Sequence, residues 1–348
     1  MVDKNFCMSS FLTFRYIIDD NKDFYDTLHH QVYHLIPEEE RITVLNEHDI
    51  DVELEKQFET VRNKRLGILL SGGMDSACLA SYMTGFDAYT FRFLGGEFQK
   101  DELTRAEYYA QKYGLNLHYV DITWETVQEN IDILMREKGA PVHSIEPQIL
   151  AAVKQANHDG IEMMIIGDAA DYVFAGMDGL HAKDWLFDEF VERYTYLNPN
   201  AVLVNPVDMG FAFEKYRQKD KIDYISLMHE YADIESYASY SNAFKTGCLP
   251  YLDPYEVLKM GLPLDLERIR NGESKYLIRA LFKNKYPEIP VPQKLPMPRP
   301  VDEYFRTWKG PIRKEFKPNL DMRLLSGNQK WLIYCLERFL NLFEPYTE

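Results

Sequence analysis

Leu70-Ser71-Gly72-Gly73-Met74-Asp75-Ser76 is the stretch that decides the fold, because it separates an apolar run from an amphipathic segment. The run before it, residues 65–70 (RLGILL), is typical of a buried strand, and residues 75–84 have the pattern of a helix. Two adjacent glycines let the backbone turn tightly and bring consecutive N–H groups close to an anion, and the serines add hydroxyl donors. We therefore predict a pyrophosphate cradle between a strand and a helix.

The same alternation of strands and helices continues along the chain. Predicted strands cover residues 87–93, 116–122 and 161–167, and predicted helices cover residues 101–113, 124–138 and 147–159. Strands separated by helices of this length indicate βαβ units, so the predicted fold class is α/β, a parallel sheet flanked by helices. Ligands bind such sheets at the carboxyl ends of the strands.

The segments on either side of this pattern are predicted to be mainly helical. We expect an N-terminal helical or extended arm (1–60) with a helix at 53–62, an α/β core (61–190), and a helical region (191–348) that completes a single domain. Aromatic residues at helical spacing in 185–285 indicate core packing. Six prolines in residues 287–300 predict an extended loop.

Composition limits the classes of function and location. Lys and Arg number 39 and Asp and Glu number 55, giving a net charge of −16, and no basic block is present. Such a chain repels phosphate backbones, which disfavours a nucleic-acid partner. Four scattered cysteines suit a reducing compartment. With neither a signal peptide nor a membrane-length apolar run, we expect a soluble cytoplasmic protein.

Asp75 indicates that the expected site also binds a metal ion. A carboxylate beside a phosphate cradle is repelled by phosphate alone, but it suits a Mg²⁺ ion that bridges phosphate oxygens. The loop lacks the G-K-[ST] ending of a Walker A motif, so it belongs to another class of phosphate loop.

Three stretches together carry a family resemblance. Residues 71–76 match the S-G-G-x-D-S loop of the ATP pyrophosphatases, which cleave ATP between the α and β phosphates. Residues 167–176 (GDAADYVFAG) resemble the G-E-G-[SA]-D-E-x-F-G-G segment of glutamine-dependent asparagine synthetases, and residues 247–253 (GCLPYLD) resemble their R-x-P-[FY]-L-D stretch. The chain thus resembles the synthetase domain of that family over about residues 53–300, which implies an adenine nucleotide α-hydrolase-like fold.

The resemblance implies ATP and Mg²⁺ as cofactors and assigns their ligands. The pyrophosphate would be held by Ser71, Gly72, Gly73, Asp75 and Ser76. The magnesium ligands would be Asp75 and Asp171, and the adenosine pocket would be lined by Leu70, Phe93 and Gly167.

The resemblance also implies catalytic residues. Lys294, in the proline-rich loop, aligns with the lysine that stabilises the adenylation transition state, where a cation neutralises developing charge. Arg299 is an alternative or an assistant to Lys294. Asp168 stands where asparagine synthetases have Glu, and a carboxylate there suits a general base for ammonia or an amine. Tyr172 and Cys248 depart from the family pattern, which indicates a substrate other than aspartate.

A glutaminase domain is expected to be absent. Position 2 is Val rather than the nucleophilic Cys of those enzymes, and only about 60 residues precede the first predicted strand. Nitrogen would come from free ammonia, a separate glutaminase, or an amine.

The leading hypothesis is an ATP-dependent, AMP- and pyrophosphate-forming amide ligase that activates a small-molecule carboxylate as an acyl-adenylate. One alternative is an intramolecular amide-forming cyclase, as in β-lactam synthetases or lasso peptide cyclases. The tRNA-modifying branch of the superfamily is disfavoured by the charge and cysteine counts. A third hypothesis is a non-catalytic nucleotide-binding or scaffold protein. The two predicted magnesium carboxylates argue against it.

Overall fold

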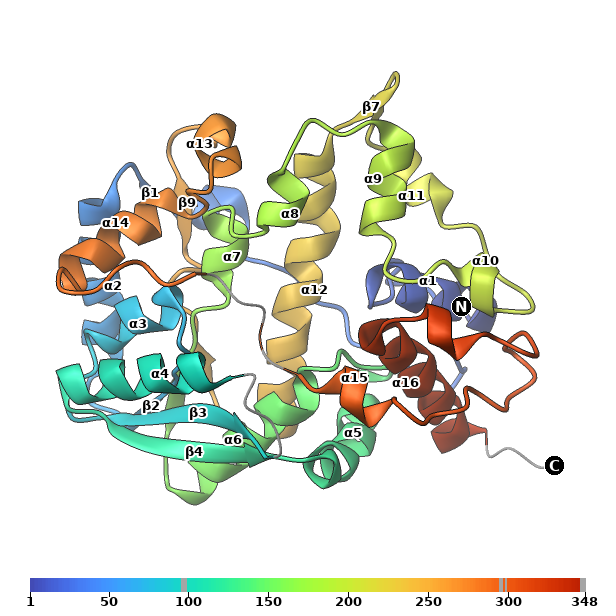
Figure 1. Ribbon diagram of the computed structural model, residues 1–348, viewed down its shortest axis with the longest axis horizontal. Coiled ribbons are helices and arrows are strands. Elements are labelled where there is room, and N and C mark those ends of the chain that lie inside the picture. Colours follow the sequence, from blue (N-terminus) through green and yellow to red (C-terminus); the bar gives the residue numbers. More distant parts are fainter. Residues whose placement is uncertain (95–98, 294–296, 298, 345–348) are drawn as a thin grey trace.

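The computed structural model describes residues 1–94, 99–293, 297 and 299–344. Within these residues, a parallel sheet and its covering helices form one side of the molecule, and a mainly helical part forms the other (Figure 1). The long helix α12 (Tyr224–Thr246) runs between the two parts. The site described below therefore lies where a sheet edge meets a helical wall.

The central sheet of the described chain has five strands in the spatial order β4-β3-β2-β5-β8, and all neighbouring pairs are parallel. Their bounds are Leu66–Leu69 (β2), Asp87–Phe93 (β3), Asn116–Ile122 (β4), Met163–Ile165 (β5) and Tyr251–Leu252 (β8). From β2 the chain builds the sheet first toward β4 and then, on the other side of β2, toward β8. The loops after β2 and β5 consequently flank a topological switch point, where open α/β sheets bind ligands.

Helices surround this sheet and form the second part of the molecule. Their bounds in the described chain, besides α12, are Lys4–Phe14 (α1), Glu47–Val61 (α2), Met74–Ala80 (α3), Lys100–Tyr113 (α4), Trp124–Lys138 (α5), Glu146–His158 (α6), Ala169–Val173 (α7), Asp178–His181 (α8), Phe187–Tyr194 (α9), Pro199–Val202 (α10), Gly210–Glu214 (α11), Leu266–Arg270 (α13), Tyr276–Lys285 (α14), Val301–Tyr304 (α15) and Gly327–Phe343 (α16). Two short pairs lie outside the main sheet: β1 (Ile42–Val44) with β9 (Leu258–Met260), and β6 (Arg217–Gln218) with β7 (Lys221–Ile222).

The predicted α/β class with a parallel sheet is confirmed. β3 and β4 have the predicted bounds, whereas β2 and β5 are shorter than predicted. The sequence does not predict β8, because two residues are too few to show alternation. This strand forms because β5 offers it a partner: the Met164 N–H donates to the Pro250 carbonyl at 2.9 Å, and the Ile166 N–H donates to the Leu252 carbonyl at 3.0 Å.

Helix ends differ from the predictions where local capping decides them. α2 begins at Glu47, earlier than predicted, because the Asn46 side chain accepts the Asp49 N–H and caps the helix there.

The aromatic residues after the sheet segment are largely core, as predicted; Phe190 and Phe213, for example, are almost fully buried. The described residues of the predicted proline-rich loop, 287–300, lie in neither helix nor strand.

Candidate active site

The loop after β2 is held in shape by its own serines and by a close approach of α4. The Ser71 hydroxyl lies 3.0 Å from the Ser76 hydroxyl and accepts the Gly73 N–H at 3.1 Å. The Ser71 N–H in turn donates to Ser76 Oγ at 3.1 Å. A side chain does not fit at Gly72, since a Cβ there would lie 2.6 Å from the Glu102 carbonyl oxygen. The loop is therefore fixed between the starts of α3 and α4.

The loop after β5 is anchored by the last residue of the predicted 247–253 motif. Asp253 Oδ2 accepts the Ala169 N–H at 2.7 Å, which ties the end of β8 to the start of α7. At the other end of α7, the Gly176 N–H donates to the Asp171 carbonyl at 2.7 Å. A Cβ at Gly176 would lie 2.0 Å from Asp171 Oδ1. Glycine at this position thus leaves room for the Asp171 carboxylate.

Lys275 joins the two loops and was not identified from the sequence. Its Nζ donates to Asp75 Oδ2 and to Asp171 Oδ1, each at 2.6 Å, and its side chain is only 2% exposed. Burial acts to lower the pKa of Lys275, but the two carboxylates outweigh it and hold the pKa above its ordinary value. The lysine is therefore charged, and it brings together the two aspartates predicted as metal ligands.

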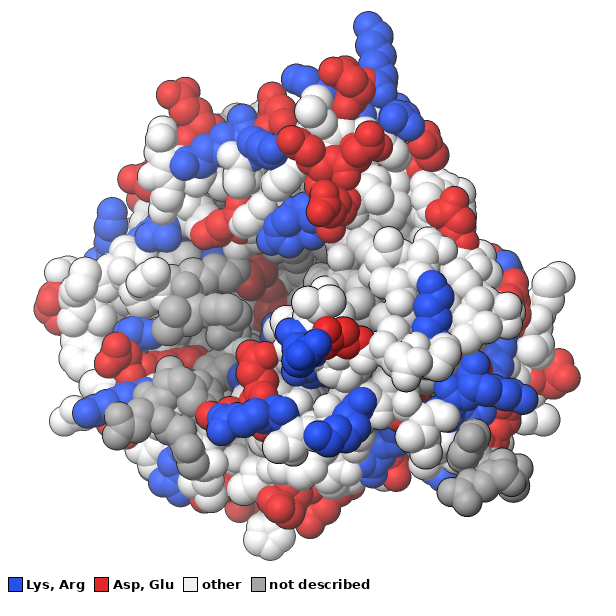
Figure 2. All heavy atoms as spheres, turned by 45° about the vertical axis from the view of Figure 1, so that its right-hand side comes forward, with Lys and Arg blue, Asp and Glu red and all other residues white. Residues whose placement is uncertain are grey.

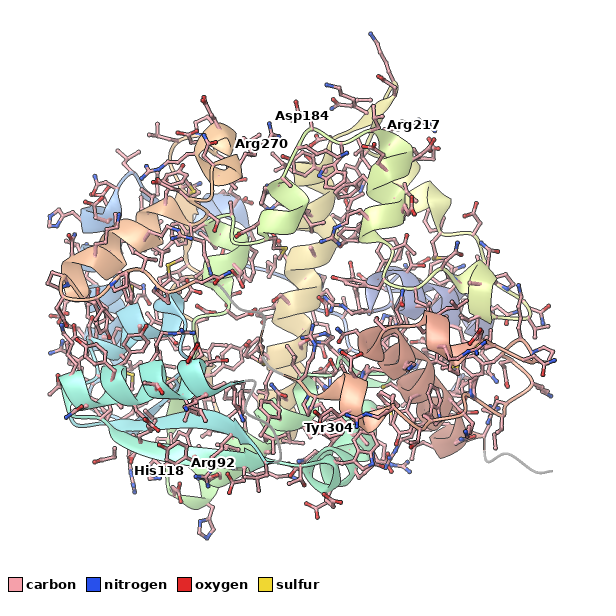
Figure 3. The ribbon with its side chains drawn as sticks, viewed as in Figure 1. Arg92, His118, Asp184, Arg217, Arg270 and Tyr304 are labelled. Atoms are coloured by element: carbon pink, nitrogen blue, oxygen red, sulfur yellow. The ribbon has the colours of Figure 1, made fainter. Side chains whose placement is uncertain are left out.

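The backbone around Lys275 is positioned by an ion pair on the preceding helix. Lys275 itself adopts a left-handed conformation (φ 51°) as the residue before α14. Arg270, at the end of α13, donates to Asp184 Oδ1 at 2.6 Å, and Figure 3 shows the two residues near each other. Arg270 Nε also donates to the His181 carbonyl at 3.2 Å. These bonds hold the turn that carries Lys275 against the segment that follows α7.

A cavity of about 220 Å³ opens at these two loops. Most of the predicted site residues line it: Leu70, Ser71, Gly72, Gly73, Asp75, Ser76, Gly167, Asp168, Asp171 and Arg299. Its wall also includes residues that the sequence did not single out, among them Tyr89, Thr90, Phe91, Ile145, Tyr240 and Lys275. Pro292, Gln293 and Met297 show that the proline-rich segment contributes to the wall.

One predicted residue, Phe93, is not found in the described part of this wall. Phe93 does not line the cavity as the described residues define it; it is 3% exposed and belongs to the hydrophobic core, and Phe91 lines the cavity instead. The reason is register: β2 ends at Leu69 opposite Tyr89, so Phe93 lies four residues, about 13 Å, farther along β3. Lys294 lies outside the described residues.

Asp168 has the properties of an acid–base group. Its Oδ2 accepts the Ser236 hydroxyl of α12 at 2.8 Å. Burial raises the pKa of Asp168 to about 7, and the nearby Asp171 and Glu235 carboxylates act in the same direction. A carboxyl group with a pKa near neutrality can exchange a proton with a ligand in the cavity.

The residues present fit a magnesium ion bound together with phosphates. Asp75 and Asp171 are hard oxygen donors, and both lie within 2.6 Å of one ammonium nitrogen, so they converge on a point that attracts cations. No group of three or more His, Cys, Asp and Glu side chains arranged for a metal ion occurs in the described part of the chain. Mg²⁺ commonly takes one or two carboxylates and completes its shell with substrate phosphates and water, so two aspartates suffice.

The parallel sheet, the glycine loop after β2 and the aspartates at the same sheet edge define an ATP pyrophosphatase-type α/β fold. The chain belongs to the asparagine synthase family, whose model matches residues 54–247, a span that includes both loops. Membership of this family supports an ATP-dependent, ligase-type activity.

Solved structures with some similarity to the chain include a tRNA thiolase and an NMN synthetase. The U34-tRNA thiolase NcsA from Methanococcus maripaludis, with its [4Fe-4S] cluster, is 14% identical over 72% of this chain and 83% of its own, with a TM-score of 0.29. The NMN synthetase from Francisella tularensis is 11% identical over 74% of this chain and 99% of its own, with a TM-score of 0.28. No curated protein sequence matches the chain. Among the described helices, none combines the length and apolarity needed to cross a membrane.

Proposed function

We propose that this protein is an ATP-dependent carbon–nitrogen ligase that forms AMP and pyrophosphate. It activates a substrate carboxylate as an acyl-adenylate and transfers the acyl group to ammonia or an amine. The observation that carries the proposal is the meeting of Asp75, Asp171 and Lys275 beside the glycine loop, in the wall of one cavity. At such a loop the buried Lys275 ammonium can bind phosphate oxygens, and the two carboxylates can bind a metal ion.

In the first step a carboxylate oxygen of the substrate attacks the α-phosphorus of ATP. The new bond joins that oxygen to the α-phosphorus, and the bond from the α-phosphorus to the bridging oxygen breaks, so pyrophosphate leaves. The backbone and hydroxyl groups of Ser71 and Ser76 bind the leaving pyrophosphate, and Lys275 stabilises the charge that develops on it. Mg²⁺, when bound, would neutralise phosphate oxygens, with Asp75 and Asp171 as its protein ligands.

In the second step the nitrogen nucleophile displaces AMP from the acyl group. Asp168 accepts the proton that the nucleophile loses, a role that suits a pKa of about 7. Ammonia, an amine, or ammonia delivered by a separate glutaminase is the proposed donor.

Surface charge supports the proposed small-molecule substrate, and the free cysteines support the proposed location. Basic and acidic side chains are interspersed over the face shown in Figure 2, and its described part has no continuous basic area. Together with the net charge of −16, this distribution on the face shown favours small-molecule substrates over nucleic acid. Cys7, Cys78, Cys248 and Cys335 are free thiols, which supports a cytoplasmic location.

The test is ATP–pyrophosphate exchange over a panel of carboxylic acids. We expect exchange that depends on one acid, that is lost in Asp171→Asn, and that is unchanged in Asp188→Asn, an exposed aspartate on α9. Binding of ATP without exchange for any acid would contradict the proposal and would favour the non-catalytic reading.

A further inference from the structure

A positively charged residue of α4, Arg105, is bonded directly to the glycine loop. Its Nε donates to the Gly72 carbonyl oxygen at 2.8 Å. The Tyr109 hydroxyl, one turn further along α4, donates to the same oxygen at 3.4 Å. Arg105 and Gly72 both line the cavity. A hydrogen bond therefore fixes the Arg105 guanidinium to the loop, within the wall of the cavity.

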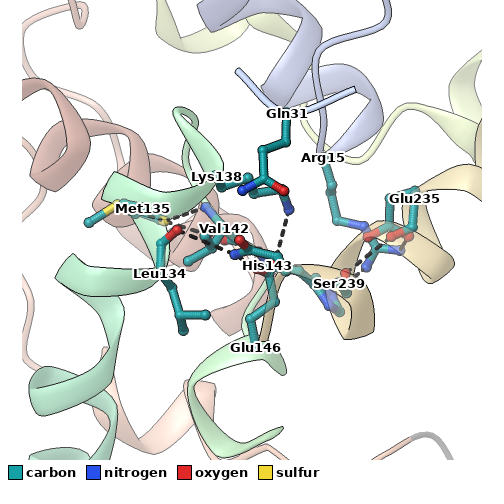
Figure 4. Close-up of polar contacts among 12 residues, drawn as sticks. Arg15, Gln31, Leu134, Met135, Lys138, Val142, His143, Glu146, Glu235 and Ser239 are labelled. Carbon is teal, nitrogen blue, oxygen red and sulfur yellow. Dashed lines mark hydrogen bonds and ion pairs between the residues drawn. The ribbon is translucent and has the colours of Figure 1, made fainter. Parts of the chain in front are cut away.

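The Arg105 guanidinium keeps hydrogen-bonding capacity beyond this contact. Among the described residues, its two Nη nitrogens have no hydrogen-bond partner, and no carboxylate forms an ion pair with it. Two cations elsewhere in the molecule are arranged differently (Figure 4). Lys138 bonds to Glu146 at 2.7 Å, and Arg15 bonds to Glu235 at 2.7 Å. Those charges are compensated within the protein, whereas the charge of Arg105 can bind an anion from the cavity.

Glu102, one turn before Arg105 on α4, also lines the cavity. Burial raises the pKa of Glu102, while the Gly72 N–H and Arg105 act to lower it. A carboxyl group with a raised pKa is a weaker counter-charge than an ordinary glutamate. Glu102 therefore shapes the loop more than it compensates Arg105: a Cβ at Gly72 would lie 2.8 Å from Glu102 Cγ.

Lys275 alone does not balance the charge of phosphates at the loop. Its ammonium is shared between Asp75 and Asp171, so these three groups together carry a net negative charge. Pyrophosphate is itself strongly negative, and like charges repel. Arg105 is bonded to Gly72, three residues before Asp75, and so adds positive charge at the same loop.

We propose that Arg105 binds the pyrophosphate moiety of ATP through its Nη groups and retains pyrophosphate after ATP is cleaved. The inference rests on the proposed function, because pyrophosphate is a product of that function. Paired N–H groups of a planar guanidinium match two oxygens of one phosphate. Since Nε is already held by the loop, the Nη groups lose little freedom when phosphate binds.

Calorimetric titration with pyrophosphate, ATP and AMP, with magnesium present throughout, tests this assignment. Arg105→Gln keeps an N–H donor for the Gly72 carbonyl but removes the charge. We expect this variant to bind pyrophosphate and ATP about tenfold or more weakly than the wild type, the range of a charge-assisted hydrogen bond, and to bind AMP equally. Arg105→Lys, which keeps the charge, should retain part of the affinity. Lys100→Gln, which removes an exposed cation at the start of α4, should match the wild type.

The inference is wrong if the wild type does not bind pyrophosphate saturably, or if Arg105→Gln binds it as tightly as the wild type. It is also wrong if Arg105→Gln and Arg105→Lys lose the same affinity, or if AMP binding falls as much as pyrophosphate binding, since Arg105 would then only support the loop. A raised KM for the acid with unchanged pyrophosphate affinity would overturn it by placing Arg105 on the acid. Failure of the proposed function is distinguishable, because pyrophosphate would then bind through Arg105 while no acid supported exchange.

Discussion

Replacing Lys275 with methionine removes the ammonium group but keeps an unbranched side chain of similar length. The variant removes the ammonium that bonds both Asp75 and Asp171, whose side chains are 22% and 33% exposed. Removing one partner of a buried ion pair costs about 3–5 kcal/mol, and partial exposure of both carboxylates to the cavity favours the lower end, about 3 kcal/mol. At about 2 °C per kcal/mol for a chain of this size, we expect the midpoint of thermal unfolding to fall by about 6 °C.

The same variant should respond to magnesium differently from the wild type. A divalent cation can replace the missing ammonium, so Mg²⁺ should raise the unfolding midpoint of Lys275→Met more than that of the wild type. Pyrophosphate exchange should fall about a hundredfold or more, because a preorganised cation at the leaving group is lost. Lys283→Met, which removes an exposed lysine from α14, the helix that follows Lys275, is the control. A Lys275→Met variant with wild-type stability and wild-type exchange would refute the reasoning.

Three further predictions concern other residues that the sequence assigned to the site. Asp75→Asn and Asp171→Asn should each lower pyrophosphate exchange about a hundredfold with an unchanged circular dichroism spectrum; near-wild-type exchange in either would remove that aspartate from the site. Asp168 has a pKa raised from 3.8 to about 7, so the folded chain binds more protons than the unfolded chain in this range and loses stability as pH rises from about 4 to 7. Asp168→Asn should flatten this part of the stability profile measured by urea unfolding, and an unchanged slope would assign the dependence elsewhere. Lys294→Ala should lower the exchange rate far more than ATP affinity, and an equal loss of both would make Lys294 a simple binding residue.

The sheet and its two loops could be predicted because they depend on local sequence. Apolar runs separated by amphipathic segments define β2 to β5, and the paired glycines at 72 and 73 mark the first loop. The backbone of these loops then places Asp75 and Asp171 at one edge, since parallel strands end on the same side. Convergence of the two carboxylates follows from topology alone.

Lys275 could not be predicted in the same way, because its role depends on a contact across a hundred residues or more. Its only local feature is a position directly before a helix, which many lysines share. Phe93 shows a second limit: Phe91 and Phe93 have the same side-chain parity on β3, and only the point at which β2 ends distinguishes them. Register between strands, like the partner of a buried lysine, is settled by tertiary packing.

Lys275, the cation of the site, comes from a different part of the chain from the two carboxylates. Asp75 and Asp171 lie within the matched span 54–247, whereas Lys275 lies beyond it. α14, which follows Lys275, is fixed against α3 by the Tyr286 hydroxyl, which donates to the Ala77 carbonyl at 2.8 Å. The carboxylates and their cation therefore meet only when the C-terminal part of the chain packs onto the sheet. Carboxylates repel phosphate and an ammonium attracts it, so the proposed binding of ATP requires this packing.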